Sequence, residues 1–363
     1  MSELIASQIE KAATLPSAYY TDEELFRRSI ERIFARSWQF IGDTSQIKMP
    51  GAVQPFTLLE GSLEEPLLLT RDWDDKVHLM SNVCTHRGYL VAEQAGCERH
   101  LRCRYHGRRF SLDGRLKSMP EFSNVEGFPA PQDDLPQVPF DRWGKFLFAG
   151  LAPTHALDEL LEDVKYRLGW LPLDEFAFDP HGTRDYLVKA NWALYCDNYL
   201  EGFHIPFVHS SLDAALDYGS YRTEIFSWSN LQLGEAQGDV ETFDLPPEAP
   251  DYGRPIGAFY YFLFPNTMLN FYPWGLSVNV VKPLSIDRTR VSFISYLWDE
   301  SKVETSAGNQ IDRVEREDEV VVEGVQRGVR SRLYDRGRYS PKREAGVHHF
   351  HRLIAAALNG EGP

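Results

Sequence analysis

The chain has 363 residues, of which 43% are hydrophobic and 25% charged, and its formal net charge is −15. This composition is ordinary for a globular protein and excludes disorder, collagen and coiled coil as descriptions of the whole chain. The acidic balance argues against nucleic acid or an anionic membrane as the main partner. No apolar run of about 18 residues and no secretory leader occurs, so we expect a cytoplasmic protein without a membrane span.

The first half of the chain predicts a helix followed by a small all-β unit. An amphipathic helix is expected over 21–38, with Thr21 as its N-cap. Residues 40–118 contain short apolar runs separated by Gly, Asp and Asn turns, which is typical of short strands. Five prolines in 119–140 indicate a connector. A strand over 145–150 and a helix over 156–170 follow, so we place a domain boundary near residue 150.

The second half predicts strands followed by helices, without a βαβ rhythm, which favours an antiparallel α+β domain. No glycine-rich dinucleotide motif follows a strand and no P-loop occurs. The chain therefore shows no dinucleotide or nucleotide fingerprint of its own. The predicted elements are a helix over 191–204, strands over 259–264, 267–271, 276–282 and 289–298, and a helix over 309–334.

Two short segments each offer one thiol and one imidazole. Cys84-Thr-His86 is followed, after sixteen intervening residues, by Cys103-Arg-Tyr-His106. Two such mixed pairs suit a Rieske [2Fe–2S] centre, in which one iron takes two cysteines and the other takes two histidines. The alternative is a tetrahedral zinc site, which accepts the same four ligands. Zinc fingers usually pair like residues in sequence, so the mixed pairs favour the iron–sulfur cluster.

A second pair of histidines lies in the helix predicted over 191–204 and just after it. His204 and His209 are five residues apart, which on a straight helix would turn their rings ~140° away from each other. Pro206 lacks an N–H and clashes with the preceding turn, so the helix should stop or kink there. His209 is then expected to swing back from a turn to meet His204. Two unrelated histidines are the alternative.

The acid-rich helix over 309–334 supplies a third candidate ligand. Asp318 lies within its apolar stripe, and a carboxylate on a buried face is costly unless it is paired or binds a metal ion. Its neighbours Glu317 and Glu319 are rotated ~100° away and should be solvated. Two histidines and one carboxylate would make a facial triad for Fe(II); a structural Asp paired with an arginine is the alternative. The stripe consists of Ile311, Val314, Val321, Val322, Val325 and Val329.

Both sets of candidate ligands carry a family resemblance. Cys84-Thr-His-Arg-Gly88 and Cys103-Arg-Tyr-His-Gly107 resemble the Rieske domain of ring-hydroxylating oxygenase α-subunits, and Asp197-Asn-Tyr-Leu-Glu201-x-x-His204-x-x-x-x-His209 resembles their catalytic domain. Length and spacing look closest to the branch of carnitine and quaternary-amine monooxygenases. The resemblance covers nearly the whole chain. One departure is Arg108, which stands where family members commonly carry tryptophan.

The resemblance implies a fold and two metal centres. Residues 1–39 would form a helical segment that packs with the catalytic domain, 40–150 an all-β Rieske domain, and 151–363 a catalytic domain with a helix-grip (START/SRPBCC-like) antiparallel sheet. By the same resemblance the cluster would be held by Cys84, His86, Cys103 and His106. The mononuclear Fe(II) would be held by His204, His209 and Asp318.

Two carboxylates near His204 have roles implied by the resemblance. Glu201 stands three residues before His204, on the same helix face. The family places a carboxylate here as a bridge between a Rieske histidine and an iron-ligand histidine, and the bridge runs between subunits of a homotrimer. Asp197, seven residues before His204, is also expected to face the site.

The remaining expectations concern ligands and partners. Tyr272 and Trp274, at a probable strand end, are the candidate pocket residues, because aromatic faces hold quaternary ammonium groups or aromatic rings. Because the chain has no nucleotide motif of its own, electrons from NAD(P)H are expected to come through a separate reductase or ferredoxin. An acidic electron donor is expected to dock on a basic collar, near Arg102, Arg104, Arg108 and Arg109. The collar consists of these four and of Arg87 and Arg99.

The predicted function is therefore that of the terminal component of a multicomponent oxygenase, which uses O₂ to hydroxylate a small molecule. Monooxygenation or oxidative dealkylation of a quaternary amine is the first expectation. An aromatic-ring dioxygenase acting on an aromatic acid or amine is the alternative. Two readings of other classes are an electron-transfer Rieske protein without oxygenase activity and a zinc-stabilised ligand-binding protein.

Overall fold

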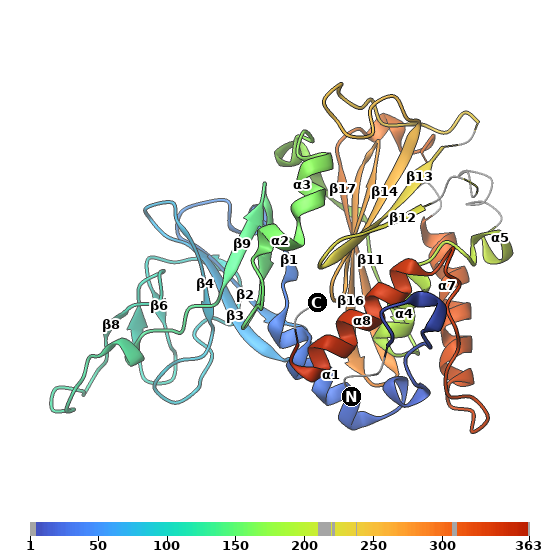
Figure 1. Cartoon of the computed structure of the whole chain (residues 1–363). Coiled ribbons are helices and arrows are strands. Elements are labelled where there is room, and N and C mark those ends of the chain that lie inside the picture. Colours follow the sequence, from blue (N-terminus) through green and yellow to red (C-terminus); the bar gives the residue numbers. More distant parts are fainter. Residues whose placement is uncertain (1–4, 210–218, 220–221, 237, 307–310, 362–363) are drawn as a thin grey trace. The chain divides into compact units, whose positions relative to one another are not determined.

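The computed structural model describes residues 5–209, 219, 222–236, 238–306 and 311–361 (Figure 1). The chain divides into two compact units. The small unit comprises Trp38–Pro153, and the large unit comprises Met1–Ser37 together with Thr154–Pro363. No helix in the described ranges is long and apolar enough to cross a membrane.

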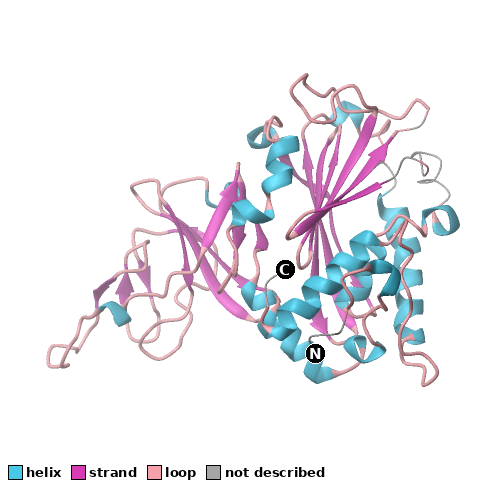
Figure 2. Ribbon diagram, in the orientation of Figure 1, coloured by secondary structure: helices cyan, strands magenta, loops and turns pink. Residues whose placement is uncertain are grey.

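The small unit consists of short antiparallel strands (Figure 2), as the turn-rich pattern predicts. They form a four-stranded sheet in the order β4-β3-β2-β5 and two three-stranded sheets, β1-β10-β9 and β6-β7-β8. The strands are β1 (Gln39–Asp43), β2 (Ala52–Leu58), β3 (Glu65–Arg71), β4 (Val77–Ser81), β5 (Gly96–Cys97), β6 (Leu101–Arg102), β7 (Arg109–Phe110), β8 (Leu116–Ser118), β9 (Phe140–Trp143) and β10 (Phe146–Ala149).

The large unit is built on one seven-stranded antiparallel sheet in the order β11-β17-β16-β15-β14-β13-β12. The predicted α+β architecture, with an all-β first unit and an antiparallel second sheet, is confirmed. The strands are β11 (Ala177–Val188), β12 (Arg222–Ile225), β13 (Ser229–Glu235), β14 (Ile256–Leu263), β15 (Thr267–Tyr272), β16 (Gly275–Ser285) and β17 (Arg288–Leu297).

Helices gather beside this sheet, with α4 packed on β16 and α7, and α7 also on β11 (Figure 1). Asp22, not the predicted Thr21, caps α1, because its carboxylate accepts the N–H groups of the first turn. The helices are α1 (Glu23–Arg32), α2 (Leu157–Leu160), α3 (Glu162–Leu168), α4 (Trp192–Tyr199), α5 (Ile205–Val208), α7 (Ile311–Gly328) and α8 (Ala345–Asn359).

Candidate metal centres

The two Cys-His segments of the small unit fold into equivalent loops. In each, the cysteine N–H donates to the carbonyl five residues later, with N···O distances of 2.8 Å for Cys84 and 2.9 Å for Cys103. The glycine four residues after each cysteine donates back to the cysteine carbonyl, at 3.0 Å for Gly88 and 3.1 Å for Gly107. Both glycines have positive φ, +72° and +75°, which residues with side chains rarely adopt. The local sequence therefore builds the same loop twice.

The four candidate donors of these loops differ in burial. Cys84 and Cys103 are each 2% exposed and belong to the apolar core of the unit, whereas His86 and His106 are half-buried, with ring centroids 4.8 Å apart. Burial raises the pKa of the Cys84 thiol. Burial, and then the charge of His106, lowers the pKa of His86, which favours the neutral imidazole that a metal ion needs. Inward thiols and outward imidazoles match the two ends of a Rieske cluster.

A single zinc ion fits these loops poorly. Four ligands at zinc bond lengths of ~2.0–2.3 Å would bring their donor atoms within ~4 Å of one another. Within the described ranges, one set of three or more His, Cys, Asp or Glu donor atoms lies mutually within 4.8 Å, and it does not include the loop residues. The wider spacing suits a cluster of two irons.

In the large unit the helix predicted over 191–204 ends earlier than expected, and the two candidate ligand histidines lie at the ends of the next helix. α4 ends at Tyr199, and the short α5 follows with His204 at its N-cap and His209 at its C-cap. The expectation that Pro206 interrupts the helix is wrong, because Pro206 lies in the first turn of α5, where a missing N–H breaks no helical hydrogen bond. The predicted meeting of the two rings nevertheless occurs, with centroids 5.1 Å apart.

Asp318, on α7, joins this pair. Its Oδ1 lies 3.0 Å from His209 Nε2 and 3.5 Å from His204 Nε2. These three residues form the set whose donor atoms all lie within 4.8 Å of one another. Two imidazole nitrogens and one carboxylate are the donor set of non-haem Fe(II) sites, and they leave the other positions of an octahedral ion open. The chemistry of the donors therefore fits mononuclear iron.

Each histidine of this set has a carboxylate behind it. His204 Nδ1 lies 2.7 Å from Glu201 Oε1, and His209 Nδ1 lies 2.8 Å from Glu317 Oε2. The bond from His209 lowers the pKa of Glu317. Burial lowers the pKa of His209, but Asp318 and Glu317 outweigh it, so that this pKa is raised. Both rings thus direct Nε2 toward Asp318. A carboxylate bonded to the other ring nitrogen is the usual arrangement behind metal-bound histidines.

Two family models match this chain. A model of the ring-hydroxylating α-subunit (catalytic domain) matches residues 175–360, and a model of the Rieske [2Fe–2S] domain matches residues 37–129. The chain belongs to the ring-hydroxylating oxygenase α-subunit family. This oxygenase is a Rieske non-haem iron enzyme, and its family carries a [2Fe–2S] cluster and a mononuclear iron.

Individual relatives of the oxygenase place it in the predicted branch. Chloroplastic choline monooxygenase from Arabidopsis thaliana is 32% identical, covering 95% of this chain and 83% of that protein. The carnitine monooxygenase oxygenase subunit of Escherichia coli K12 is 27% identical, covering 98% and 96%. A quaternary ammonium Rieske monooxygenase of known structure has the same fold, with a TM-score of 0.79, 23% identity and 98% of both chains covered. The quaternary-amine resemblance is confirmed; the cytoplasmic location stays a prediction.

Asp197 of the oxygenase lies outside the set of three donors. Its two carboxylate oxygens accept hydrogen bonds from Tyr20 Oη at 3.0 Å and from His351 Nε2 at 2.8 Å. His351 is 1% exposed and also bonds Tyr339 Oη at 2.7 Å. Asp197 thus ties α4 to α8 and the N-terminal segment, which gives it a structural contact rather than the expected one to the iron donors.

The two aromatic residues predicted for the pocket pack together. Tyr272 and Trp274 stack with ring centroids 5.2 Å apart and an interplanar angle of 9°, and both are buried. Ile311, the first residue of α7, packs against this pair. Within the described part of the chain, Trp274 Nε1 is a buried donor without a hydrogen-bond partner. The stack therefore lies against the helix that carries Asp318.

Glu315 is a buried acid that sequence reasoning missed. It is 3% exposed, and its Oε2 accepts a hydrogen bond from Tyr195 Oη at 2.5 Å. Its Oε1 has no partner among the described residues. Burial raises the pKa of Glu315 well above the usual value. Its position four residues after Ile311 and three before Asp318 puts it on their helix face.

The basic collar is smaller than predicted. Arg102, Arg104 and Arg109 are exposed, and Arg104 pairs with Glu93 at 3.3 Å. Arg108 is only 2% exposed, so its inclusion in a docking surface is wrong.

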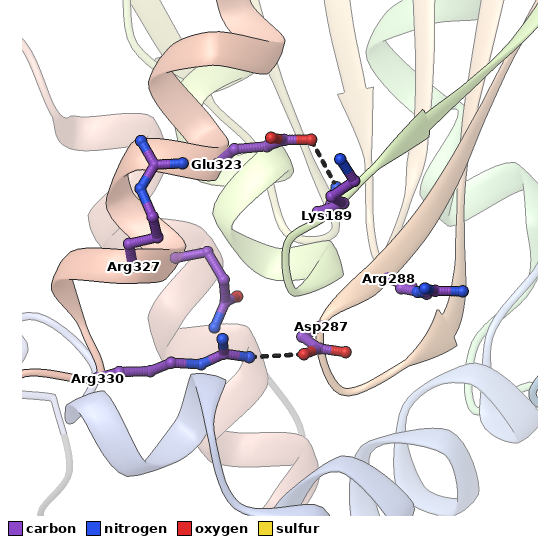
Figure 3. Close-up of a pocket in the computed structure, with 7 residues that line it drawn as sticks. Lys189, Asp287, Arg288, Glu323, Arg327 and Arg330 are labelled. Carbon is purple, nitrogen blue, oxygen red and sulfur yellow. Dashed lines mark hydrogen bonds and ion pairs between the residues drawn. The ribbon is translucent and has the colours of Figure 1, made fainter.

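A polar surface pocket of about 280 Å³ lies at the C-terminal end of α7 (Figure 3). Arg330 bonds Asp287 across it at 2.6 Å, and the backbone N–H of Lys189 donates to Glu323 at 3.1 Å. The pocket contains no histidine or cysteine and is separate from both donor sets. Its lining residues are Lys189, Asp287, Arg288, Glu323, Gln326, Arg327 and Arg330.

Proposed function

We propose that this oxygenase hydroxylates a carbon next to the nitrogen of a quaternary ammonium compound. One oxygen atom of O₂ enters the C–H bond, and two electrons and two protons convert the other into water. The hydroxylated carbon bears the nitrogen, so its C–N bond can then break: the nitrogen leaves with the bonding electron pair as a tertiary amine, the carbon becomes an aldehyde, and the hydroxyl proton is released. The convergence of His204, His209 and Asp318 carries the oxygenase part of the proposal, and the choline and carnitine relatives support the substrate class.

Within this proposal the two donor sets have different tasks. Cys84, His86, Cys103 and His106 hold the cluster, and His204, His209 and Asp318 hold the iron. The iron, when bound, supplies activation of O₂. The chain holds the ligand rings through Glu201 and Glu317, whose bonds to the Nδ1 atoms set the tautomer and the ring orientation.

Glu201 is also proposed to couple the two centres. Its Oε1 is hydrogen-bonded to Nδ1 of the His204 ring, and its Oε2 accepts hydrogen bonds from the backbone N–H groups of Phe203 and His204. A carboxylate has about four acceptor positions, so it retains capacity for a histidine of a neighbouring subunit. For the structurally similar quaternary ammonium monooxygenase, inter-subunit electron transfer is reported, which supports transfer between subunits here; the homotrimer itself remains the expectation from the family resemblance. A separate NAD(P)H reductase or ferredoxin would deliver electrons near Arg102, Arg104 and Arg109.

Glu315 supports a cationic substrate. A buried carboxylate oxygen without a partner is costly, and a bound cation would supply the missing partner. The face of α7 that carries Glu315 runs from Ile311, against the Tyr272–Trp274 stack, to Asp318. A trimethylammonium group held there would meet a carboxylate and aromatic faces together, with its methyl groups toward the iron donors.

Substrate-dependent O₂ uptake tests this function. With a surrogate reductase, wild-type enzyme should respond to choline or L-carnitine and not to 3,3-dimethylbutan-1-ol, the uncharged isostere of choline, or to benzoate. A response to benzoate alone would favour the aromatic-ring dioxygenase.

The Glu315→Gln variant should lower kcat/KM for the responding cation by roughly 30-fold, because losing one buried charge partner costs about 2 kcal/mol or more. Since burial raises the pKa of Glu315, the wild-type carboxylate loses its charge as the pH falls. The KM of the wild type should therefore rise toward low pH, and the KM of the variant should not. A kcat/KM of E315Q for the cation equal to that of the wild type would contradict this role.

Replacing Glu317 with glutamine should weaken iron binding by about 10–100-fold, the usual cost of losing an outer carboxylate behind a metal-bound histidine. The measurement is iron retained against a graded chelator, with the cluster absorbance as internal reference. Glu319→Gln is the matched control, since Glu319 pairs with Arg316 and contacts no ligand histidine. Equal iron retention in both variants would show that Glu317 does not support His209.

A further inference from the structure

Arg108 is a cation buried beside the second Cys-His loop. Its backbone carbonyl accepts the Cys103 N–H at 2.9 Å, and its side chain is 2% exposed. The guanidinium carbon lies 5.7 Å from the ring centroid of Phe110 and 5.6 Å from that of Phe128. Aromatic faces and burial hold the charge in one place and shield it from water.

A single acidic residue anchors this cation and connects it to the first loop. Arg108 Nη2 donates to Asp133 Oδ1 at 2.7 Å and to the Asp133 carbonyl at 3.1 Å. The same carbonyl accepts the hydroxyl of Thr85 at 2.6 Å, and Thr85 lies between Cys84 and His86. Asp133 is thus hydrogen-bonded both to Arg108 and to the first Cys-His loop.

The bonding of Arg108 is incomplete, although its charge is buried. Its Nε is a buried donor without a hydrogen-bond partner among the described residues. An arginine placed only for packing would leave no such donor, since a buried N–H without a partner is costly.

We propose that Arg108 raises the reduction potential of the cluster and that Asp133 moderates this effect. The proposal rests on the assignment of the cluster to the two loops. Reduction adds one electron, so a nearby buried cation stabilises the reduced form, and a nearby anion stabilises the oxidised form. Net charge around the cluster is one of the factors that set the potential of iron–sulfur centres. Arg108 would therefore act through its charge on the cluster, and a higher reduction potential would make electron transfer from the donor to the cluster more favourable.

Spectroelectrochemical titration of the purified full-length oxygenase tests this role. Arg108→Gln should make the cluster about tenfold harder to reduce, which for one electron is about 59 mV downward. Arg108→Lys, which keeps the charge, should stay near the wild-type value. Arg115→Gln is the matched control, because Arg115 is an exposed arginine of the same unit that lies outside both loops, and it should leave the potential unchanged.

The possible outcomes separate this inference from the proposed function. An R108Q protein with an intact cluster spectrum and an unshifted potential would overturn the inference. If R108Q does not assemble the cluster, Asp133→Asn decides, because it keeps Arg108 and removes the opposing charge; its potential should rise, and an unchanged or lower value would overturn the inference. A wild-type protein that never shows a [2Fe–2S] spectrum would instead contradict the assignment of the loops.

Discussion

Replacing Asp318 with alanine is expected to abolish substrate-dependent O₂ uptake while leaving the cluster intact. The change removes the only carboxylate of the set whose donor atoms lie within 4.8 Å of one another. Only the imidazoles of His204 and His209 would remain as ligands. Loss of an outer partner alone costs 10–100-fold in metal affinity or activity, so loss of a direct ligand should cost more than about 100-fold. Iron analysis should fall from three irons per chain to two.

The matched control for Asp318 is Asp312→Asn on the same helix. Asp312 accepts a hydrogen bond from Tyr186 Oη at 2.7 Å and lies outside the donor set. Its replacement should keep all three irons and most of the turnover. Retained turnover in D318A would favour another third ligand, and turnover absent in wild type with an intact cluster would favour the electron-transfer protein.

The two candidate cluster loops could be located from the sequence because their determinants are local. The cysteine, histidine and glycine of each loop fall within five residues, and the glycine of each has positive φ. Arg108 could not be placed in the same way. Its burial depends on Asp133, which lies 25 residues later in a proline-rich segment whose path the sequence does not specify.

Asp318 was identified by a pattern that is only partly correct. Val325, a member of the predicted apolar stripe, is 43% exposed, whereas Glu315, which the stripe does not include, is 3% exposed. Three consecutive valines at 320–322 cannot all face inward on a helix, so hydrophobicity alone misplaces the edge of the stripe. The sequence predicts that Glu317 is rotated away from the buried face of α7 and is therefore solvated. That expectation considers α7 alone and is wrong, because His209, at the end of α5, contacts the Glu317 carboxylate.

Replacing Glu201 with glutamine is expected to slow electron transfer between the centres far more than it weakens iron binding. The amide keeps the size of the side chain but loses the charge that meets His204 and the N–H groups at the start of α5. Dithionite should still reduce the cluster. Excess Fe(II) should offset the weaker iron binding expected when an outer carboxylate is replaced, so that iron content stays at three per chain. Reoxidation of the reduced cluster by O₂ with substrate should slow by about 100-fold or more, measured by stopped-flow absorbance.

The control for Glu201 is Glu344→Gln, an acid whose pKa is raised first by burial and also by the charge of Glu201. It bonds the Ser340 N–H rather than a ligand histidine, so reoxidation should remain near the wild-type rate. If E201Q loses iron as D318A does, Glu201 acts as a support for His204 alone.

If electrons cross between subunits, a mixture of Cys103→Ser chains and Asp318→Ala chains assembled together should regain turnover that neither possesses, because each neighbour supplies the centre that the other lacks.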